Sequence, residues 1–417
     1  MKKYTFILIL VFLISSCNQK TNNSNTSQID QNQSSDSLTT ALEKIQSKNT
    51  INGFGVAIVD QNGILYENGI GYADIEKNKA YTQHTLQNIA SVSKTLIGVA
   101  LMKAQEMDAL SLDDPINKHL PFNVNNPYFP TDTITIRHLA THTSSIQDAP
   151  VYNEQSYILK NKEATSNPVL KDIHETFNPP TNKVSLHDFL KQVFEKEGTW
   201  YTKESFLDKK PGSFFEYTNI GATLAALVLE HATGESYDVF TKKHILKPLS
   251  MNSSGWSYDD IALEMHSKLY ANPKTELPFY SLITYPDGGF ITSSHDLGLY
   301  LSELIKGYSG KGTILTKDSY QELFRKQMRP DQFLERDSEN PYDDEYDFGI
   351  FIGFSAKGYV GHTGGDPGVS SFMFFDTEKK IGRLLFINTN LINQEAVNDF
   401  FAIWDTLGNY QEKLTSP

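Results

Sequence analysis

The feature that most constrains the fold of this chain is the position of its β-strand patterns, which lie at the two ends of the folded sequence. They are rich in apolar and β-branched residues, and QNG and TEKK between neighbouring runs are typical of hairpin turns. The strand patterns are GFGVAIVD (53–60), ILYENGIGYAD (64–74), GYVGHTGG (358–365), SSFMFFD (370–376) and GRLLFINT (382–389). Between the two groups, helical patterns and loops dominate the chain from about residue 90 to 340.

Strands from both ends can bury their apolar faces together only if they join one sheet. Helical spacing in LTTALEKIQSK, which begins at Leu38, and in QEAVNDFFAIWDTLGNY (394–410) predicts a helix at each end of the folded part. We therefore expect an α+β fold, in which an antiparallel β-sheet is flanked by N- and C-terminal helices and the middle builds an all-helical lobe.

The first residues, MKKYTFILILVFLISSC, have a basic start, a short apolar run and small residues, which is the pattern of a secretory signal. The apolar run is short for a transmembrane helix. Cys17 is the only cysteine of the chain, and ISSC resembles a bacterial lipobox. We expect a signal peptide over residues 1–16, lipidation of Cys17, a disordered tether over 17–37 and one folded domain over 38–417. The alternative is a free cysteine in a discarded signal.

The composition disfavours a nucleic-acid partner, because the formal net charge is -13 and lysines and arginines form no run. LERDSENPYDDEYD (334–347) is acidic, but its carboxylates lack the spacing of a calcium loop, so we expect a solvated loop. His138 and His142 have the spacing of a zinc pair, without a nearby glutamate or a third ligand, and we expect structural roles. DGG (287–289) is explained by a turn with positive φ.

The stretch NIASVSKTLIGVALMKAQ (88–105) places Ser91 and Lys94 three residues apart where a helix begins. Residues at this spacing share a helix face, so the hydroxyl and the amine can meet. A buried amine can take the proton of a serine and make it a nucleophile. The alternative is a helix cap at Ser91 and a solvated lysine, because SxxK alone occurs by chance.

Two later segments favour the nucleophile and base over the helix cap and solvated lysine. FFEYTNIGATLAALVLEHATG supplies Tyr217 and Asn219 before an apolar helix, and GHTGGDPG supplies His362, Thr363 and Gly364 at a strand. SxxK followed by a polar loop and a KTG-like strand is the signature of β-lactamases and penicillin-binding proteins. On these motifs the chain resembles the serine β-lactamase and penicillin-binding-protein-like superfamily, in its class C β-lactamase, DD-peptidase and esterase branch, from about residue 40 to 410.

The resemblance implies a role for each matched residue. Ser91 would be acylated, Lys94 would move its proton, Tyr217 would act as base and then as proton donor, and Asn219 would hold Lys94 and the substrate amide. His362, Thr363 and Gly364 would bind substrate, and the backbone N–H groups of Ser91 and Gly365 would form the oxyanion hole.

The chain departs from its relatives at two motif positions. His362 stands where true β-lactamases have lysine, and imidazole holds a carboxylate less firmly than an ammonium, which disfavours efficient β-lactam hydrolysis. Ser145 replaces the usual glycine of HTSG, for which we expect only a loop adjustment.

The sequence therefore predicts a serine hydrolase acting through an acyl-enzyme on D-amino-acid peptides, as DD-carboxypeptidases or D-aminopeptidases do, or on esters. The alternatives are a class C-like β-lactamase and a penicillin- or peptide-binding lipoprotein without turnover. The resemblance implies no cofactor and no metal. We expect a monomer, anchored through Cys17 at the periplasmic or cell-envelope membrane surface of a bacterium.

Overall fold

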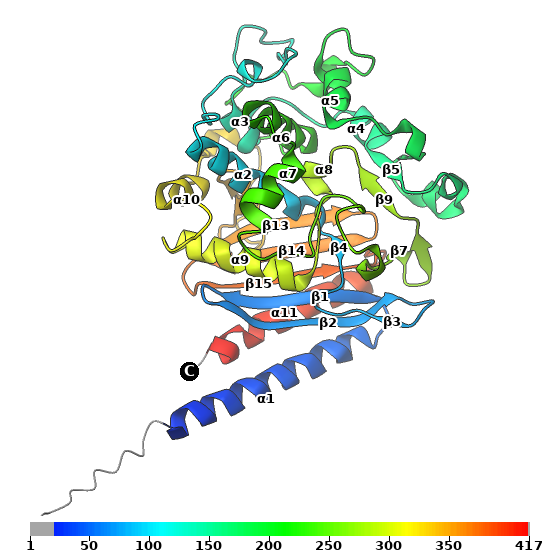
Figure 1. Ribbon diagram of the computed structural model, residues 1–417, viewed down its shortest axis with the longest axis vertical. Helices are drawn as coiled ribbons and strands as arrows, with labels where there is room; N and C mark the ends of the chain where they lie inside the picture. The colour runs from blue at the N-terminus through cyan, green and yellow to red at the C-terminus, as the bar shows by residue number, and fades with distance from the viewer. Residues whose placement is uncertain (1–20, 416–417) are drawn as a thin grey trace, which may run out of the picture.

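The computed structural model describes residues 21–415, and an eight-stranded antiparallel sheet joins the two ends of this region (Figure 1). The strand order is β11-β12-β13-β14-β15-β1-β2-β3. β1 pairs with β15, with Val56 opposite Leu385, which confirms the expected pairing of distant strands. The strands are β1 (Gly53–Asp60), β2 (Gly63–Asp74), β3 (Lys79–Ala80), β11 (Asp347–Phe348), β12 (Gly353–Phe354), β13 (Tyr359–Asp366), β14 (Val369–Asp376) and β15 (Ile381–Ile387).

Two terminal helices, α1 (Thr21–Gln46) and α11 (Gln394–Thr415), pack side by side on one face of this sheet (Figure 1). Leu38 and Leu42 of α1 and Trp404 of α11 are fully buried in the layer between helices and sheet. Burying such side chains contributes about 1.5–3 kcal/mol each.

Helix α1 begins earlier than the sequence indicates, because it includes residues 21–37, for which a tether was expected. Among the α1 side chains that the structure describes, Leu38 is the first that is buried. Once the packed half of the helix is formed, each added residue gains a backbone hydrogen bond without a new nucleation cost. Cys17 and the signal-like segment lie outside the described residues.

The other face of the sheet carries α9 (Ser294–Tyr308) and, beyond it, the lobe built from the middle of the chain. Its core helices are α2 (Lys94–Glu106) and α6 (Asn219–Thr233), both almost wholly buried. The remaining helices are α3 (Ile136–Ala140), α4 (Pro150–Gln155), α5 (Leu186–Phe194), α7 (Tyr237–Thr241), α8 (Tyr285–Gly288) and α10 (Lys317–Leu323). The predicted α+β architecture is confirmed.

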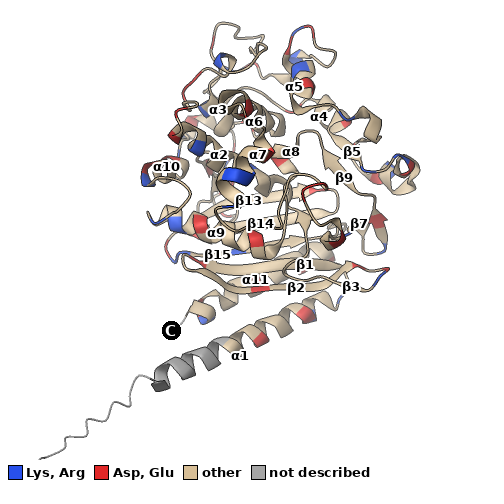
Figure 2. Cartoon of the chain, in the orientation of Figure 1, with Lys and Arg blue, Asp and Glu red and all other residues tan. Residues whose placement is uncertain are grey.

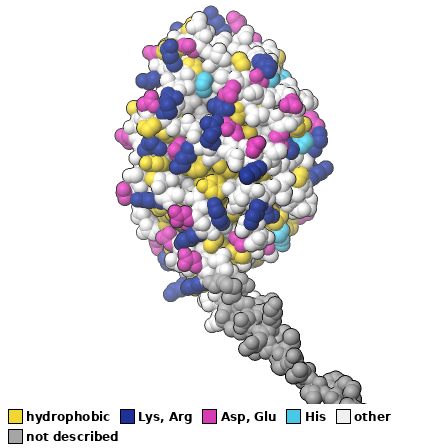
Figure 3. Space-filling model, turned by 90° about the vertical axis from the view of Figure 1, so that its left-hand side faces the viewer, with side chains coloured by type: hydrophobic (Ala, Val, Ile, Leu, Met, Phe, Trp, Pro, Cys, Tyr) yellow, Lys and Arg dark blue, Asp and Glu magenta, His cyan; other side chains and the backbone are white. Residues whose placement is uncertain are grey.

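The lobe is not all-helical as expected, because its long loops pair with one another in short strands. They are β4 (Gln87–Asn88), β5 (Tyr157–Leu159), β6 (Phe177–Asn178), β7 (Leu269–Asn272), β8 (Thr275–Leu277), β9 (Tyr280–Leu282) and β10 (Ile291–Thr292). Acidic and basic side chains are interspersed over both lobes (Figure 2) and over the face turned toward the viewer in Figure 3. No helix within residues 21–415 combines the length and apolarity that crossing a membrane requires.

Candidate active site

Ser91 and Lys94 meet where the chain enters α2. Ser91 lies in a 3₁₀ turn, Ala90–Ser93, and Lys94 is the first residue of α2, so the two do not share one α-helical turn as expected. The lysine Nζ is nevertheless 2.9 Å from the serine Oγ. Ala90 has φ +47°, a left-handed conformation that is costly for a residue with a Cβ and that turns Ser91 toward the lysine.

The Lys94 side chain is fully buried and its Nζ has three oxygen neighbours. Besides the Ser91 Oγ, these are the Asn219 Oδ1 at 2.7 Å and the Asp287 carbonyl oxygen at 2.8 Å. Burial lowers the pKa of Lys94, while the carboxylates of Asp287 and Asp148 act in the opposite direction. A neutral amine donates two hydrogen bonds and has one lone pair, so donation to the amide and to the carbonyl leaves the lone pair for the serine proton. The solvated lysine considered from the sequence is excluded.

Tyr217 lies directly before α6 and closes the site opposite the serine. The centroid of the Tyr217 ring is 5.1 Å from the Lys94 Nζ. The ring stacks on that of His142, with 4.6 Å between the two centroids. Burial raises the pKa of the Tyr217 phenol well above its ordinary value, and a hydrogen bond with Ser91 opposes this rise. The phenol is therefore neutral at physiological pH and can donate a proton beside the serine.

Asp148, which the sequence analysis did not single out, fixes the start of α6. Its Oδ2 accepts hydrogen bonds from the backbone N–H and the side-chain Nδ2 of Asn219, both at 2.9 Å. Its Oδ1 accepts from the Thr218 hydroxyl at 2.8 Å and from the Ile220 N–H at 2.9 Å. A carboxylate at a helix N-terminus is favoured by the free N–H groups there. By engaging the Asn219 nitrogen, Asp148 turns the amide oxygen toward Lys94.

Strand β13 brings the third motif to the same point. A Cβ added to Gly364 would lie 2.7 Å from the Ile89 carbonyl oxygen and 3.0 Å from the Ser91 backbone nitrogen. The motif therefore needs glycine at this position, because any side chain would collide with the backbone that carries the nucleophile. At Gly365 the same Cβ would meet no atom within 4 Å.

His362 and Thr363 both face Asp344, a buried residue of the acidic loop. The Asp344 carboxylate accepts from the Thr363 N–H at 2.6 Å and from its hydroxyl at 3.1 Å, and lies 3.3 Å from the His362 Nδ1. Burial lowers the pKa of His362, although Asp344 opposes this. The Thr363 N–H and hydroxyl are thus occupied by a carboxylate of the protein itself, whereas the buried His362 Nε2 has no hydrogen-bond partner within the described residues. The loop over 334–347, for which full solvation was expected, holds a buried structural residue.

Comparison with known proteins agrees with this arrangement. The family model described as "Beta-lactamase" matches residues 38–408, nearly the whole described region. The chain belongs to the beta-lactamase family. Members of this family are typically serine hydrolases.

One relative and two solved structures with a similar fold illustrate the match. Protein flp of Staphylococcus aureus (strain MW2) is 26% identical over 366 residues, which cover 86% of this chain and 64% of the relative, so the chain spans less than two thirds of that protein. An octameric penicillin-binding protein homologue from Pyrococcus abyssi is 24% identical, with a TM-score of 0.67 and coverage of 89% and 77%. D-amino acid amidase from Ochrobactrum anthropi SV3 is 19% identical, with a TM-score of 0.63 and coverage of 89% and 99%.

The two histidines at zinc-pair spacing have separate neighbours in this beta-lactamase fold. His142 stacks under Tyr217 and accepts from the Thr218 N–H at 3.2 Å, whereas the His138 Nδ1 accepts from the Thr135 N–H at 3.3 Å. No group of three or more histidine, cysteine, aspartate or glutamate side chains in the described part of the chain could hold a metal ion.

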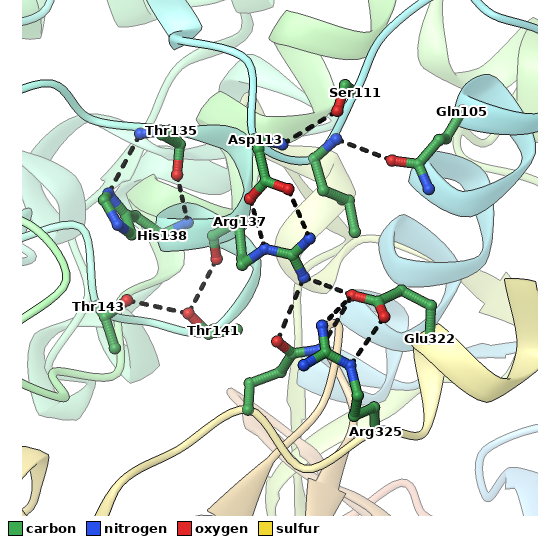
Figure 4. Close-up of polar contacts among 12 residues, drawn as sticks. Gln105, Ser111, Asp113, Thr135, Arg137, His138, Thr141, Thr143, Glu322 and Arg325 are labelled. Atoms are coloured by element: carbon green, nitrogen blue, oxygen red, sulfur yellow. Dashed lines mark hydrogen bonds and ion pairs between the residues drawn. The ribbon is translucent and has the colours of Figure 1, made fainter.

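The loop that carries His142 is held in place by an ion-pair network around Arg137 (Figure 4). The Arg137 guanidinium donates to both oxygens of Asp113, at 2.7 and 3.0 Å, and to Glu322 of α10, which also pairs with Arg325. The two arginines lower the pKa of Glu322 to about 2 against the effect of its burial. The network joins α3, which directly precedes the His142 loop, to α10.

The structure brings together Ser91, Lys94, Tyr217 and Asn219, with Gly364 against the serine backbone. The sequence analysis missed Asp148, Asp344 and the Lys94 contact of Asp287, since only the folded chain shows which isolated aspartate reaches the site. One expectation about the DGG segment was wrong, because neither Gly288 nor Gly289 has positive φ. A Cβ on Gly289 would lie 3.0 Å from the Tyr285 Cα, so close packing accounts for the glycine instead.

Proposed function

We propose that the protein is a serine hydrolase that forms an acyl-enzyme on Ser91 from D-amino-acid peptides or amides, or from esters. The observation that carries this proposal is the buried Lys94 amine with two fixed acceptors and the Ser91 hydroxyl as its third neighbour. Such an arrangement supplies a general base to a nucleophile at hydrogen-bonding distance.

In the proposed acylation, Lys94 takes the Ser91 proton while Oγ bonds to the substrate carbonyl carbon. The N–H groups of Ser91 and Gly365 stabilise the oxyanion, a contribution for which one lost donor typically costs ~10²–10³ in rate. The C–N or C–O bond to the leaving group then breaks as Tyr217 donates its proton, which Lys94 restores. Water hydrolyses the ester, and the acid leaves with free Ser91 regenerated.

A specific observation ranks the alternatives. In a class C-like β-lactamase the strand motif would hold the substrate carboxylate, but here His362 is 2% exposed and Thr363 is bonded to Asp344. A binding protein without turnover would not need the Lys94–Ser91 contact. These observations favour a hydrolase whose substrate places no carboxylate at the strand motif over a class C-like β-lactamase and over a binding protein.

The test is labelling of Ser91 followed by mass spectrometry. The wild type, Ser91→Ala and Ser166→Ala, which changes an exposed serine, are incubated with a fluorophosphonate and with a fluorescent penicillin. We expect fluorophosphonate on Ser91 of the wild type and of Ser166→Ala only. Rapid loss of a penicillin adduct would instead identify a β-lactamase, and no label from either reagent would support a binding protein. Turnover of D-amino-acid amides, D-Ala-D-Ala peptides and short esters then defines the substrate.

We also propose export and lipid anchoring at Cys17, on the strength of the signal-like N-terminus and its lipobox-like ISSC. The family match begins at residue 38 and so does not include the signal-like segment. Fatty-acid incorporation and membrane fractionation of wild type and Cys17→Ser test this. Equal recovery of both proteins in the soluble fraction, without lipid, would refute it.

A further inference from the structure

An open cavity of about 640 Å³ lies beside Tyr217, outside the cluster of groups around Lys94. Two segments form it: residues 214–217 before α6, and residues between 333 and 345 before β11. Tyr217 belongs to both the cavity and the candidate active site. Because the proposed reaction delivers the Tyr217 proton to the leaving group, the leaving group lies next to Tyr217, the residue that the site and this cavity share.

The cavity wall carries a strong excess of negative charge. Its acidic residues are Glu216, Glu335, Asp337, Asp343 and Glu345. Burial raises the pKa of Glu216 and of Asp343, and that of Glu345 to about 7, and neighbouring carboxylates add to each rise, so Glu345 carries only part of its negative charge at neutral pH. Acidic side chains that line one cavity disfavour one another's negative charge and favour the approach of a cation.

One basic side chain, Arg336, is among the lining residues, and its charge is already engaged. Its guanidinium carbon lies 4.1 Å from the centre of the Tyr346 ring and 4.6 Å from that of Phe333. Its Nε donates to the Tyr346 carbonyl oxygen at 2.6 Å, and its Nη2 is 3.8 Å from the Asp347 carboxylate. These contacts hold Arg336 against Phe333, Tyr346 and Asp347, so it is one partly engaged positive charge beside five acidic residues.

A further carboxylate, that of Asp344, lies between the loop that lines this cavity and strand β13. Asp344 uses the Thr363 N–H and hydroxyl and faces the His362 Nδ1, so the strand presents a carboxylate and not an anion-binding group. The aromatic rings of Phe214, Phe215 and Phe333 complete the wall, and such faces attract cations. Lys209 already lies over Phe214, with its Nζ 5.5 Å from the ring centroid.

We propose that this cavity binds the leaving-group half of the substrate and selects a leaving group that carries a positive charge, such as a lysinamide-like amine, over one that ends in a carboxylate. This inference rests on the proposed acyl transfer at Ser91 and narrows its substrate class. It disfavours peptides whose leaving amino acid has a free C-terminus.

The test compares substrates that share one acyl group and differ only in leaving-group charge. N-acetyl-D-alanyl lysinamide, norleucinamide and norleucine carry a positive, no and a negative charge beyond the scissile bond, and choline and 3,3-dimethylbutyl esters of one acid form a second matched pair. At low salt we expect kcat/KM of the cationic compound to exceed that of its neutral isostere at least about tenfold, and that of the carboxylate to fall below it. Salt should reduce the difference.

The matched variant is the double substitution Glu216→Gln with Glu345→Gln, because neither side chain makes a hydrogen bond or ion pair that the described structure contains. It should reduce the cation preference toward one, where the preference is the ratio of kcat/KM for the cationic and the neutral compound measured with the same variant. The control, Glu378→Gln, changes an exposed acid outside the cavity and should keep the preference.

Two outcomes overturn the inference while leaving the proposed function intact: Ser91 is labelled by fluorophosphonate but charge has no effect on kcat/KM, or the cation preference survives the double substitution. If Ser91 is not labelled, the proposed function fails first. Calorimetric binding of the three N-acetyl-D-alanyl compounds to Ser91→Ala then decides the inference separately, since equal affinities contradict it and tighter binding of the cation supports it.

Discussion

Asp148 receives two hydrogen bonds of 2.9 Å from Asn219, one from its backbone N–H and one from its side-chain amide. The backbone hydrogen bond places the carboxylate at the N-terminus of α6. The side-chain hydrogen bond engages the amide nitrogen, so the amide oxygen faces Lys94. An aspartate that carries no role of its own in the reaction thus orients the amide that orients the base. The Asp148 carboxylate therefore both caps α6 and belongs to the polar network of the site.

Asp148→Ala should lower kcat by about 10²-fold, because the Asn219 amide can then rotate and Lys94 loses a fixed acceptor. It should also lower the free energy of unfolding by about 1–3 kcal/mol through unpaired donors at the helix start. Thr218→Ala is the matched control, since it removes the helix cap but keeps both Asn219 bonds. We expect it to cost about 1 kcal/mol of stability with little change in kcat. Equal kcat losses in both variants would contradict a positioning role for Asp148.

Gly364→Ala should abolish most activity, whereas Gly365→Ala should retain it. The new methyl group at 364 would press on the Ile89 carbonyl and the Ser91 nitrogen, while at 365 it meets no atom within 4 Å and the N–H remains. Fluorophosphonate labelling rates and circular dichroism of the two folded variants measure this. Similar labelling rates for the two variants would show that the close approach of β13 to Ser91 is unimportant.

Ser145→Gly should stabilise the protein by about 1 kcal/mol. Ser145 has φ +65°, and its buried hydroxyl lacks a hydrogen-bond partner in the described structure. Removing the left-handed strain of about 1–2 kcal/mol and the unpaired hydroxyl outweighs the chain entropy that glycine adds to the unfolded state. Urea unfolding checks this. Ser144→Gly serves as the control and should destabilise, because the Ser144 hydroxyl accepts from the Ile146 N–H.

Asp287→Asn should make the free energy of unfolding less dependent on pH between about 4 and 6. Burial raises the pKa of Asp287 from 3.8 to about 6, although Lys94 and hydrogen bonds from Thr223 and Tyr152 oppose the rise. The folded protein thus keeps a proton that the unfolded chain releases, and this stabilisation is full below pH 3.8 and lost as the pH rises through about 6. Because the pKa of Asp287 rises by about 2, this stabilisation is at most about 3 kcal/mol.

Urea unfolding at several pH values, with Glu378→Gln as the control for an exposed acid, measures this contribution. The wild type and the control should lose stability in parallel across this interval, and the difference between wild type and Asp287→Asn should change with pH. A difference that stays constant from pH 4 to 6 would mean that Asp287 is ionised throughout.

The sequence determined the fold class and the motif residues that lie nearest to Ser91. Strand patterns at both ends of the chain left one way to bury their apolar faces, and β1 does pair with β15. The motifs around Ser91, Lys94, Tyr217, Asn219 and Gly364 were recognisable because local spacing and residue type already describe their chemistry. The resemblance on these motifs agrees with the family match.

Tertiary structure decided which isolated residues join that site. Asp148, Asp287 and Asp344 look like many other aspartates of an acidic chain, and their partners lie from 19 to 193 residues away along the sequence. Neither the hydrophobic periodicity nor a sequence motif encodes such contacts, because they arise where segments distant in the sequence pack together. The left-handed backbone at Ala90 and Ser145 and the acidic cavity beside Tyr217 exist for the same reason: they depend on how loops are held by the lobe and the sheet, and not on local preference.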